Sequence, residues 1–425
     1  MAPKQHATVR PLRILQVTDS FLPVVGGIER YVATLSQRLA AEGAAVTVAT
    51  LDYPNALAEE NVDGYRVIRL KGLTAHLRRF ASDPGHYFHP TVPDPKLVRE
   101  LQRIVDEFQP DIVHAHGWIV ESCVLLRRGP ATALVATLHE YGVACAKKTY
   151  TRVATGCPEG PALMRCIACS RQTYGLPKAI VLSTGLRLVR PLHRRVDRWI
   201  AVSAAVKQAS LVATRCSEDE IDVVPGFVED EVARLVATPV TFSLPEQPFL
   251  LFVGAMGPHK GLDVLLQARR RIAGRPPLVI LGTPRADSPD LTDDGVTVQE
   301  NVPHPQVIAC FAAAAVGVVP SVWPEPFGLV AIECLSVGTP VVVSDTGGLG
   351  EIVRDGVDGL RVPAGDADAL ARALDRVLYE PGLAGRLATA ARERAKEYEI
   401  RRVLPRLLAS YEIARRHRRE HSGAG

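Results

Sequence analysis

The chain has 425 residues, of which 47% are hydrophobic and 23% are charged. This composition excludes a disordered chain, a collagen-like repeat and a coiled coil as the main state, and the length predicts two or three globular domains. The 50 Lys and Arg residues barely outnumber the 46 Asp and Glu residues. A net charge of +4 in so long a chain gives no reason to expect nucleic acid as a partner.

The N-terminal segment does not predict a signal peptide or a membrane helix. Its apolar run before Asp19 is only five or six residues long, whereas a signal peptide needs about 7 to 15 apolar residues and a membrane helix about 20. No other stretch approaches the length of a membrane helix. We therefore expect a cytoplasmic protein.

Short apolar runs alternate with helical periods along the first half of the chain. The expected strands are 12–17, 44–50, 111–116, 133–138 and 198–203. Each run is nearly continuous in hydrophobicity, which is typical of strands that are buried on both faces of a parallel sheet. Between the first two runs, helical spacing of Ile28, Val32, Leu35 and Leu39 completes a strand–helix–strand unit.

A proline-bearing segment at 238–248 interrupts this alternation, which then starts again with expected strands at 249–255, 277–282, 316–321 and 340–345. We predict an α/β protein with two doubly wound, parallel-sheet, Rossmann-like domains, 1–240 and 248–400, that face each other across a cleft. Ligands of such sheets bind at the carboxyl ends of the strands.

Two adjacent glycines, Gly26 and Gly27, stand between the first expected strand and the following helix. They do not form the G-x-G-x-x-G pattern of a nicotinamide-binding turn. Glycines at a helix N-terminus let backbone amides approach an anion, which the helix dipole also favours. A plain strand-to-helix turn that needs positive φ is the alternative interpretation.

The segment 319–353 is the richest in candidate residues. Seven residues separate Glu325 from Glu333, and Pro326 is expected in the first helical turn. The amides of 327–329 would then have no partner inside the helix and would form an anion site. A simple helix cap is the alternative for Glu325 alone.

These motifs resemble glycosyltransferase family 4. The resemblance covers about 12–400 and rests on E-P-F-G-L-x-x-x-E at 325–333, G-T-P-V-V-V-S-D-T-G-G at 338–348, V-G-x(5)-K-G at 253–261, the strand–GG–helix, H-A-H-G at 114–117 and His139. The family consists of retaining, nucleotide-sugar-dependent enzymes of the GT-B fold. The resemblance therefore implies a hexosyltransferase that moves a sugar from a nucleotide diphosphate sugar to the hydroxyl group of a glycan, a lipid-linked or a small-molecule acceptor.

The resemblance also implies roles for single residues on the donor side. Glu333 would hydrogen-bond the ribose, and Glu325 the hydroxyl groups of the donor sugar. The diphosphate would be held by Lys260 and by the amides of Phe327, Gly328 and Leu329. No cofactor is then needed for catalysis, because a lysine and oriented amides stabilise the charge of the departing phosphate.

Further implications of the resemblance concern the first domain. His139 would lie near the sugar or the acceptor and would act in catalysis with Glu325 and Lys260. Gly26 and Gly27 would contact the donor phosphate or leave room for the acceptor. The last helices, at about 383–417, would cross back to the first domain, so that 400–425 is a crossing helix and a solvated tail.

Two positions depart from the family pattern. Ala255 stands where the family usually has an arginine, so one of two phosphate-binding cations is missing. Gly226-Phe227 replaces an N-G turn. Two alternatives stay open: a catalytically silent sugar-nucleotide-binding protein, and a sugar-nucleotide epimerase or phosphorylase of similar architecture.

Other polar motifs have two interpretations each. His114 and His116 alternate along an expected strand, and each is either a core histidine or part of the cleft lining. Asp366 and Asp368 are expected to open a helix as caps rather than to bind a metal. In 183–199, arginines interleaved with apolar residues form either a solvated face or a surface that docks on an acidic acceptor or, in peripheral contact, on the inner face of the membrane. These arginines are Arg187, Arg190, Arg194, Arg195 and Arg198.

Four of the eight cysteines crowd into a loop-like stretch at 142–175, and they are Cys145, Cys157, Cys166 and Cys169. Their spacing, C-x11-C-x8-C-x2-C, ends in the C-x2-C half that is common in structural zinc sites. A structural zinc or another thiolate-bound metal is one interpretation, and unligated thiols or disulfides are the others. The remaining cysteines lie in apolar segments of the sequence and are expected to be core thiols.

Overall fold

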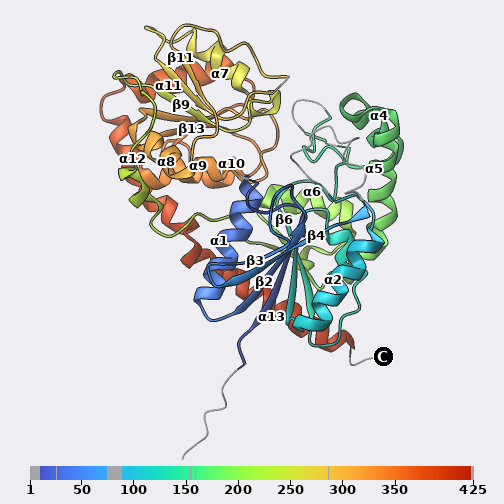
Figure 1. The fold of residues 1–425 in the computed structure, drawn as a ribbon. Coiled ribbons are helices and arrows are strands. Elements are labelled where there is room, and N and C mark those ends of the chain that lie inside the picture. The colour runs from blue at the N-terminus through green and yellow to red at the C-terminus, as the bar shows by residue number, and fades with distance from the viewer. Residues whose placement is uncertain are drawn as a thin grey trace, which may run out of the picture.

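The computed structural model of the chain describes residues 10–24, 26–73, 89–152, 156–157, 159–285 and 287–422. These residues form two α/β domains, each built on a largely parallel sheet with helices packed against it (Figure 1). The predicted fold class is therefore confirmed. Most of the N-terminal leader considered above, 1–9, lies outside the described residues.

The first sheet has eight strands in the order β3-β4-β2-β1-β5-β6-β7-β8, and its neighbouring strands are parallel except for β3 and β4. Its strands are β1 (Arg13–Thr18), β2 (Ala45–Leu51), β3 (Glu59–Val62), β4 (Tyr65–Leu70), β5 (Ile112–His116), β6 (Ala133–Leu138), β7 (Arg198–Ala201) and β8 (Ile221–Val223). Helices of this part are α1 (Gly27–Ala41), α2 (Pro95–Phe108), α3 (Val120–Cys123), α4 (Leu163–Tyr174), α5 (Leu176–Val189) and α6 (Ala204–Thr214).

The second sheet has six parallel strands in the order β11-β10-β9-β12-β13-β14. Its strands are β9 (Leu250–Val253), β10 (Leu278–Leu281), β11 (Val296–Gln299), β12 (Val316–Val319), β13 (Val341–Ser344) and β14 (Leu360–Val362). Its helices are α7 (Leu262–Arg269), α8 (His304–Ala313), α9 (Leu329–Val337), α10 (Leu349–Ile352), α11 (Ala367–Tyr379) and α12 (Leu383–Ala395). Among the described residues, no helix is long and apolar enough to cross a bilayer.

The strand order reverses beside the first strand of each sheet. β1 lies between β2 and β5, and β9 lies between β10 and β12. Crevices at the carboxyl ends of such strands are where open α/β sheets bind ligands. The loops after β1, β9 and β12 carry Gly26, Lys260 and Glu325, so the topology itself brings the predicted site residues to these edges.

The chain returns to the first domain through α13 (Ile400–Ser422). Its residues Leu407 and Tyr411 are buried in a core cluster that also contains Ile14 and Val135 of the first sheet. Helix α12 instead packs on α9, so α13 alone makes the crossing rather than all of 383–417. The expected tail is helical through Ser422, because Arg418 donates hydrogen bonds to two carbonyl groups of the first domain.

The basic stretch 183–199 is not one amphipathic helix. α5 ends at Val189, a 3-10 helix spans Arg190–Arg195, and β7 begins at Arg198. The Arg198 guanidinium pairs with Asp222, so this arginine does not belong to an open helix face. The exposed arginines of the stretch are Arg187, Arg194 and Arg195.

Candidate active site

Glu325 lies in the loop after β12, buried within a hydrogen-bond cluster. Its carboxylate accepts hydrogen bonds from Lys260 Nζ at 2.8 and 2.9 Å, from Ser321 Oγ at 2.8 Å and from Trp323 Nε1 at 2.9 Å. Burial raises the pKa of Glu325, but Lys260 and these hydrogen bonds outweigh burial and hold the pKa below its usual value. Glu325 is therefore a fixed carboxylate, suited to accept hydrogen bonds from hydroxyl groups.

Lys260 reaches Glu325 because two loops pack closely. Lys260 ends a short 3-10 helix, Pro258–Lys260, and Gly261 follows with φ of +70°. A Cβ atom at Gly261 would lie 1.9 Å from the carbonyl oxygen of Pro320. Only glycine allows this approach, which sets the loop after β9 directly on the end of β12.

Helix α9 begins at Leu329, with Gly328 as its N-cap at φ of +120°. The expectation that Pro326 lies in the first helical turn is therefore wrong, since a residue of positive φ separates Pro326 from the helix. A Cβ atom at Gly328 would also lie 2.5 Å from Leu349 Cδ2. The first-turn amides without helical partners start at Leu329, while those of Phe327 and Gly328 belong to the preceding loop.

Glu333 lies one turn into α9 and is also buried. Its Oε1 is 2.9 Å from His304 Nε2 and 3.0 Å from Arg30 Nη1. Burial raises the pKa of Glu333, but Arg30 and His304 outweigh burial and lower it. Because Arg30 belongs to α1, this ion pair joins the two domains.

The N-termini of α1 and α9 face each other. A Cβ atom at Gly27 would lie 3.6 Å from Leu329 Cδ1, and Ser203 Oγ donates a 2.6 Å hydrogen bond to the carbonyl of Pro326. Gly26 has an extended backbone with φ of −158°, so positive φ is not the reason for this glycine. The glycine pair instead stands where the two domains meet.

His139, at the end of β6, is backed by buried polar groups. Its Nε2 lies 2.9 Å from His116 Nδ1, and His116 Nε2 lies 2.7 Å from Gln16 Oε1. Burial lowers the pKa of His139 to about 3 and that of His116 well below its usual value, so both rings are neutral. Because an amide oxygen only accepts, His116 donates to Gln16 and accepts from His139. His139 Nδ1 is thereby fixed as a hydrogen-bond acceptor.

The other polar candidates are structural. His114 is fully buried, with ring nitrogens 2.7 Å from both Tyr411 Oη and Thr137 Oγ1, as a core histidine should be. His116 is fully buried, with its ring against that of His139. The Asp366 carboxylate accepts from the amide of Ala369 and caps α11.

Comparison with known sequences identifies the family. The profile described as Glycosyltransferase Family 4 matches residues 25–232, and the profile described as Glycosyl transferases group 1 matches 239–394. The D-inositol 3-phosphate glycosyltransferase 1 of Catenulispora acidiphila is 30% identical over 326 residues, which is 72% of either chain. The chain belongs to glycosyltransferase family 4.

Further relatives of this glycosyltransferase match nearly its whole length. The D-inositol 3-phosphate glycosyltransferase of Kribbella flavida is 28% identical over 92% of this chain and 91% of its own. The solved sucrose-phosphate synthase of Thermosynechococcus elongatus superposes with a TM-score of 0.71 at 24% identity, covering 94% and 98% of the two chains. The chain is thus a nucleotide-sugar-dependent hexosyltransferase of the GT-B fold, as its motifs predict.

The structure shows what surrounds the positions at which this glycosyltransferase departs from its family pattern. Phe227 is buried, with its ring centroid 4.3 Å from that of Tyr31. A Cβ atom at Gly226 would lie 2.5 Å from the Phe327 ring, so this turn packs between the domains instead of offering an asparagine. Ala255 is exposed after β9.

Several side chains at this glycosyltransferase's site were not predicted from the sequence, and they include Arg30, His304 and Asp19. The Asp19 carboxylate accepts hydrogen bonds from the amides of Trp118 at 3.0 Å and Ile119 at 2.7 Å, and burial, opposed by Lys148, raises its pKa to about 7. Its position directly after a buried parallel strand is a signal that could have found it. No local signal singles out Arg30 or His304.

Proposed function

We propose that the enzyme transfers the hexose with retention of configuration, with its donor bound over the N-terminus of α9. The observation that carries this proposal is the pair of buried, ionised carboxylates, Glu325 and Glu333, beside Lys260. Glu333 would accept hydrogen bonds from the ribose, and Glu325 from the sugar. The diphosphate would lie between them, near Lys260, the amides of 327–329 and the glycine pair Gly26 and Gly27.

The chemistry of the departing group supports retention without a protein base. The bond between the sugar and the phosphate oxygen breaks, and Lys260 and the backbone amides stabilise the negative charge that develops on that oxygen. The acceptor hydroxyl attacks on the same face, and its proton passes to the departing phosphate. His139, whose pKa is about 3, would orient a hydroxyl group through Nδ1 rather than remove a proton at neutral pH.

We further propose Arg30 as the second cation for the diphosphate, in place of the arginine missing at Ala255. Arg30 pairs with Glu333 at 3.0 Å, and its Nε is buried without a hydrogen-bond partner among the described residues. When ribose hydroxyls bind to Glu333, the guanidinium of Arg30 would be released and could donate bidentate hydrogen bonds to a phosphate.

Steady-state kinetics of three variants tests this role of Arg30. Arg30→Ala should lower kcat/KM for the donor at least about tenfold, and Arg30→Lys should restore only part of the loss, because lysine lacks the planar fork. The control is Arg285→Ala, which removes an exposed cation that lies near Gly257 and pairs with Asp287. A large loss in Arg285→Ala and none in Arg30→Ala would contradict the assignment.

Acceptor-dependent release of a nucleoside diphosphate tests the transfer itself. A thermal-shift screen of nucleotide sugars finds the donor first, since a ligand of the native state raises the melting temperature. With that donor, release should require an acceptor hydroxyl, and the anomeric configuration of the product should match that of the donor. Donor binding without acceptor-dependent release would favour the silent binding protein instead.

We also propose peripheral contact with the cytoplasmic face of an anionic membrane, through α4 and α5, which lie at the edge of the first domain (Figure 1). Large apolar side chains are exposed on these helices: Met164 at 76%, Leu176 at 52%, Ile180 at 44%, Val181 at 62% and Leu188 at 67%. Exposed cations accompany them, namely Arg171, Lys178 and Arg187. Apolar side chains flanked by cations suit a lipid surface with anionic headgroups.

Vesicle flotation tests this surface. The wild type should bind anionic vesicles and should be released by salt. A Val181→Glu/Leu188→Glu variant should lose most of the binding, whereas the control Leu57→Glu, which changes a leucine that is 65% exposed elsewhere in the first domain, should not. Equal binding by all three proteins would contradict the proposal.

A further inference from the structure

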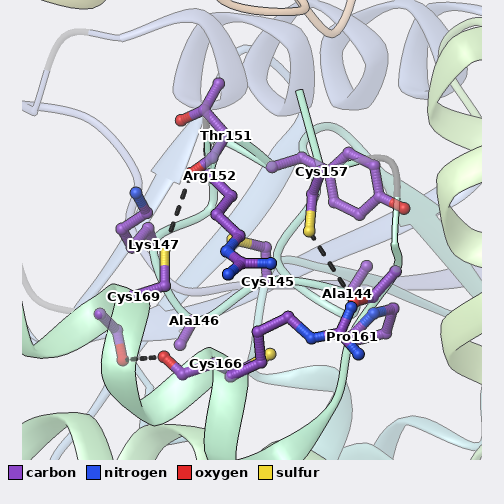
Figure 2. Close-up of a pocket in the computed structure, with 14 residues that line it drawn as sticks. Ala144, Cys145, Ala146, Lys147, Thr151, Arg152, Cys157, Pro161, Cys166 and Cys169 are labelled. Atoms are coloured by element: carbon purple, nitrogen blue, oxygen red, sulfur yellow. Dashed lines mark hydrogen bonds between the residues drawn. The ribbon is translucent and has the colours of Figure 1, made fainter. Parts of the chain in front are cut away.

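The four clustered cysteines line one pocket. Figure 2 shows Cys145, Cys157, Cys166 and Cys169 around this pocket, which lies between the loop after His139 and α4. Cys166 and Cys169, three residues apart on α4, share one face of that helix. The fold thus gathers cysteines from three separate places in the chain.

The thiols have only weak partners in this arrangement. Cys157 Sγ donates to the Gly160 carbonyl and Cys169 Sγ to the Thr151 carbonyl, each at 3.8 Å (Figure 2). All four side chains are half-buried and free of disulfides. Among described residues, Cys123, Cys310 and Cys334 are instead fully buried, as core thiols are. Among the clustered cysteines, Cys145 packs against a core cluster, whereas Cys157, Cys166 and Cys169 belong to no core cluster of the described residues. Core packing therefore does not explain these three.

Helix α4 has few buried residues, and the loop before it has an unfavourable backbone conformation at two positions. All twelve residues of α4 are described, and Ser170 alone is buried. The loop holds Lys148 and Tyr150 at φ of 64° and 53°, a conformation that is unfavourable for residues other than glycine. α4 packs mainly against α5, so a metal ion bound by its cysteines would join this helix to the preceding loop and stabilise the folded state.

We propose that these four cysteines bind one Zn²⁺ ion through their thiolates. Four cysteine ligands around zinc are a common structural site, and they leave no open position for catalysis. Each thiol that binds loses its proton to solvent. Lys147, Arg152 and Arg165 also line the pocket, and both arginines pair with Glu159. The positive charge that exceeds the charge of Glu159 would offset the net negative charge of a zinc ion with four thiolates.

Binding requires the side chains to turn inward. In their present positions, no three or more His, Cys, Asp or Glu side chains of the described residues are arranged as a metal site. The sulfur atoms must close to about 2.3 Å from a common centre. Rotation about the side-chain torsions of the four cysteines would supply this movement.

The ion would fix a segment that lies close to residues beside the candidate active site. A Cβ atom at Gly156, next to Cys157, would lie 4.0 Å from Pro324 Cγ of the second domain. Pro324 directly precedes Glu325. The ring of Tyr141, two residues after His139, stacks on that of Tyr150 at 5.2 Å. Zinc would therefore hold residues that neighbour both His139 and Glu325.

Metal analysis of the full chain, purified without chelator from zinc-supplied cells, tests the proposal. The wild type should contain about one zinc per chain, and Cys166→Ser and Cys169→Ser should each contain less than about 0.2. The control is Cys216→Ser, which changes a half-buried cysteine outside the pocket and should keep its zinc. Replacement by Co²⁺ in the wild type should give the visible spectrum of a tetrahedral thiolate site, a readout that does not depend on any variant folding.

Three results would overturn the proposal. The first is a wild type with less than about 0.2 metal per chain whose four clustered thiols titrate freely in the folded protein. The second is a mass that shows two disulfides in this segment. The third is equal loss of zinc from Cys216→Ser. None of these readouts involves the transferase reaction, so they are independent of the proposed function.

Discussion

Replacing Lys260 by methionine should destabilise the protein through the carboxylate that it leaves behind. Glu325 is 8% exposed, and without Lys260 its charge keeps only the hydrogen bonds from Ser321 and Trp323. Removing one partner of a fully buried ion pair costs about 3 to 5 kcal/mol. The Lys260 side chain is 24% exposed, and two donors remain, so we expect about 1 to 3 kcal/mol.

Thermal melting of the wild type, Lys260→Met, Glu325→Gln and the double variant, which together form a double-mutant cycle, measures this destabilisation. For a domain of 150 to 250 residues, about 1 kcal/mol shifts the melting midpoint by about 2 to 4 °C, so Lys260→Met should lower it by about 2 to 12 °C. Lys260→Met/Glu325→Gln should melt above Lys260→Met, because the unpaired charge is gone. As a control, Lys396→Met breaks an ion pair with Glu393 that is exposed on both sides and should cost less than about 1 kcal/mol.

The loss of stability in Lys260→Met should become smaller as the pH falls. The pKa of Glu325 is lowered in the folded chain, so its contribution to stability is present above the unfolded pKa and is lost as the pH falls through the folded pKa. In Lys260→Met, burial is left as the larger influence and raises that pKa. The difference in melting midpoint between the wild type and Lys260→Met should therefore become smaller as the pH falls from about 7 to about 4. A constant difference, or a double variant no more stable than Lys260→Met, would refute the reasoning.

Three further predictions concern other buried side chains. Glu333→Gln should weaken binding of the nucleoside diphosphate by about 1 to 3 kcal/mol in calorimetry, because a charged acceptor for ribose hydroxyls becomes neutral, and unchanged affinity would count against the ribose assignment. His116→Phe should lower turnover more than donor affinity, because it frees the tautomer of His139, and His116→Gln should recover part of the loss; a wild-type rate in His116→Phe would show that the ring only fills space. Burial lowers the pKa of His114, His116 and His139, so below about pH 6.5 the unfolded chain binds protons that the folded chain does not. The melting midpoint should therefore fall from about pH 7 to about pH 5, and more steeply in the wild type than in His114→Gln.

Continuous apolar runs predicted the central strands, but not the edges of either sheet. β4 alternates buried and half-buried residues and contains Arg66 and Arg69, so its sequence is not a continuous apolar run. Arg69 is nonetheless buried, because its guanidinium donates to the carbonyl groups of Leu57 and Leu22. β8, β11 and β14 are three or four residues long and only partly buried. Short strands that lie half in solvent lack the periodicity on which such a prediction depends.

Motif spacing predicted the residues of the second domain that converge on the site, but not their partners from the first. Lys260 and Glu325 stand on neighbouring strand ends of one sheet, so topology alone brings them together. Arg30 meets Glu333 only because the two domains face each other, and a single arginine on an amphipathic helix is indistinguishable in sequence from a solvated one. Likewise, the tautomer of His139 depends on Gln16, which lies on a different strand.

Helix α13 sets the order in which this protein can be completed during synthesis. Every strand of both sheets precedes it in the chain, yet its Tyr411 and Leu407 cover apolar residues such as Ile14 and Val135 of the first sheet. On the ribosome, the first domain must wait with one apolar face uncovered while the whole second domain is made, in contrast to the usual domain-by-domain order. A premature stop beyond residue 400 would therefore damage the domain made first, and the nascent first domain is where a chaperone would be expected to bind.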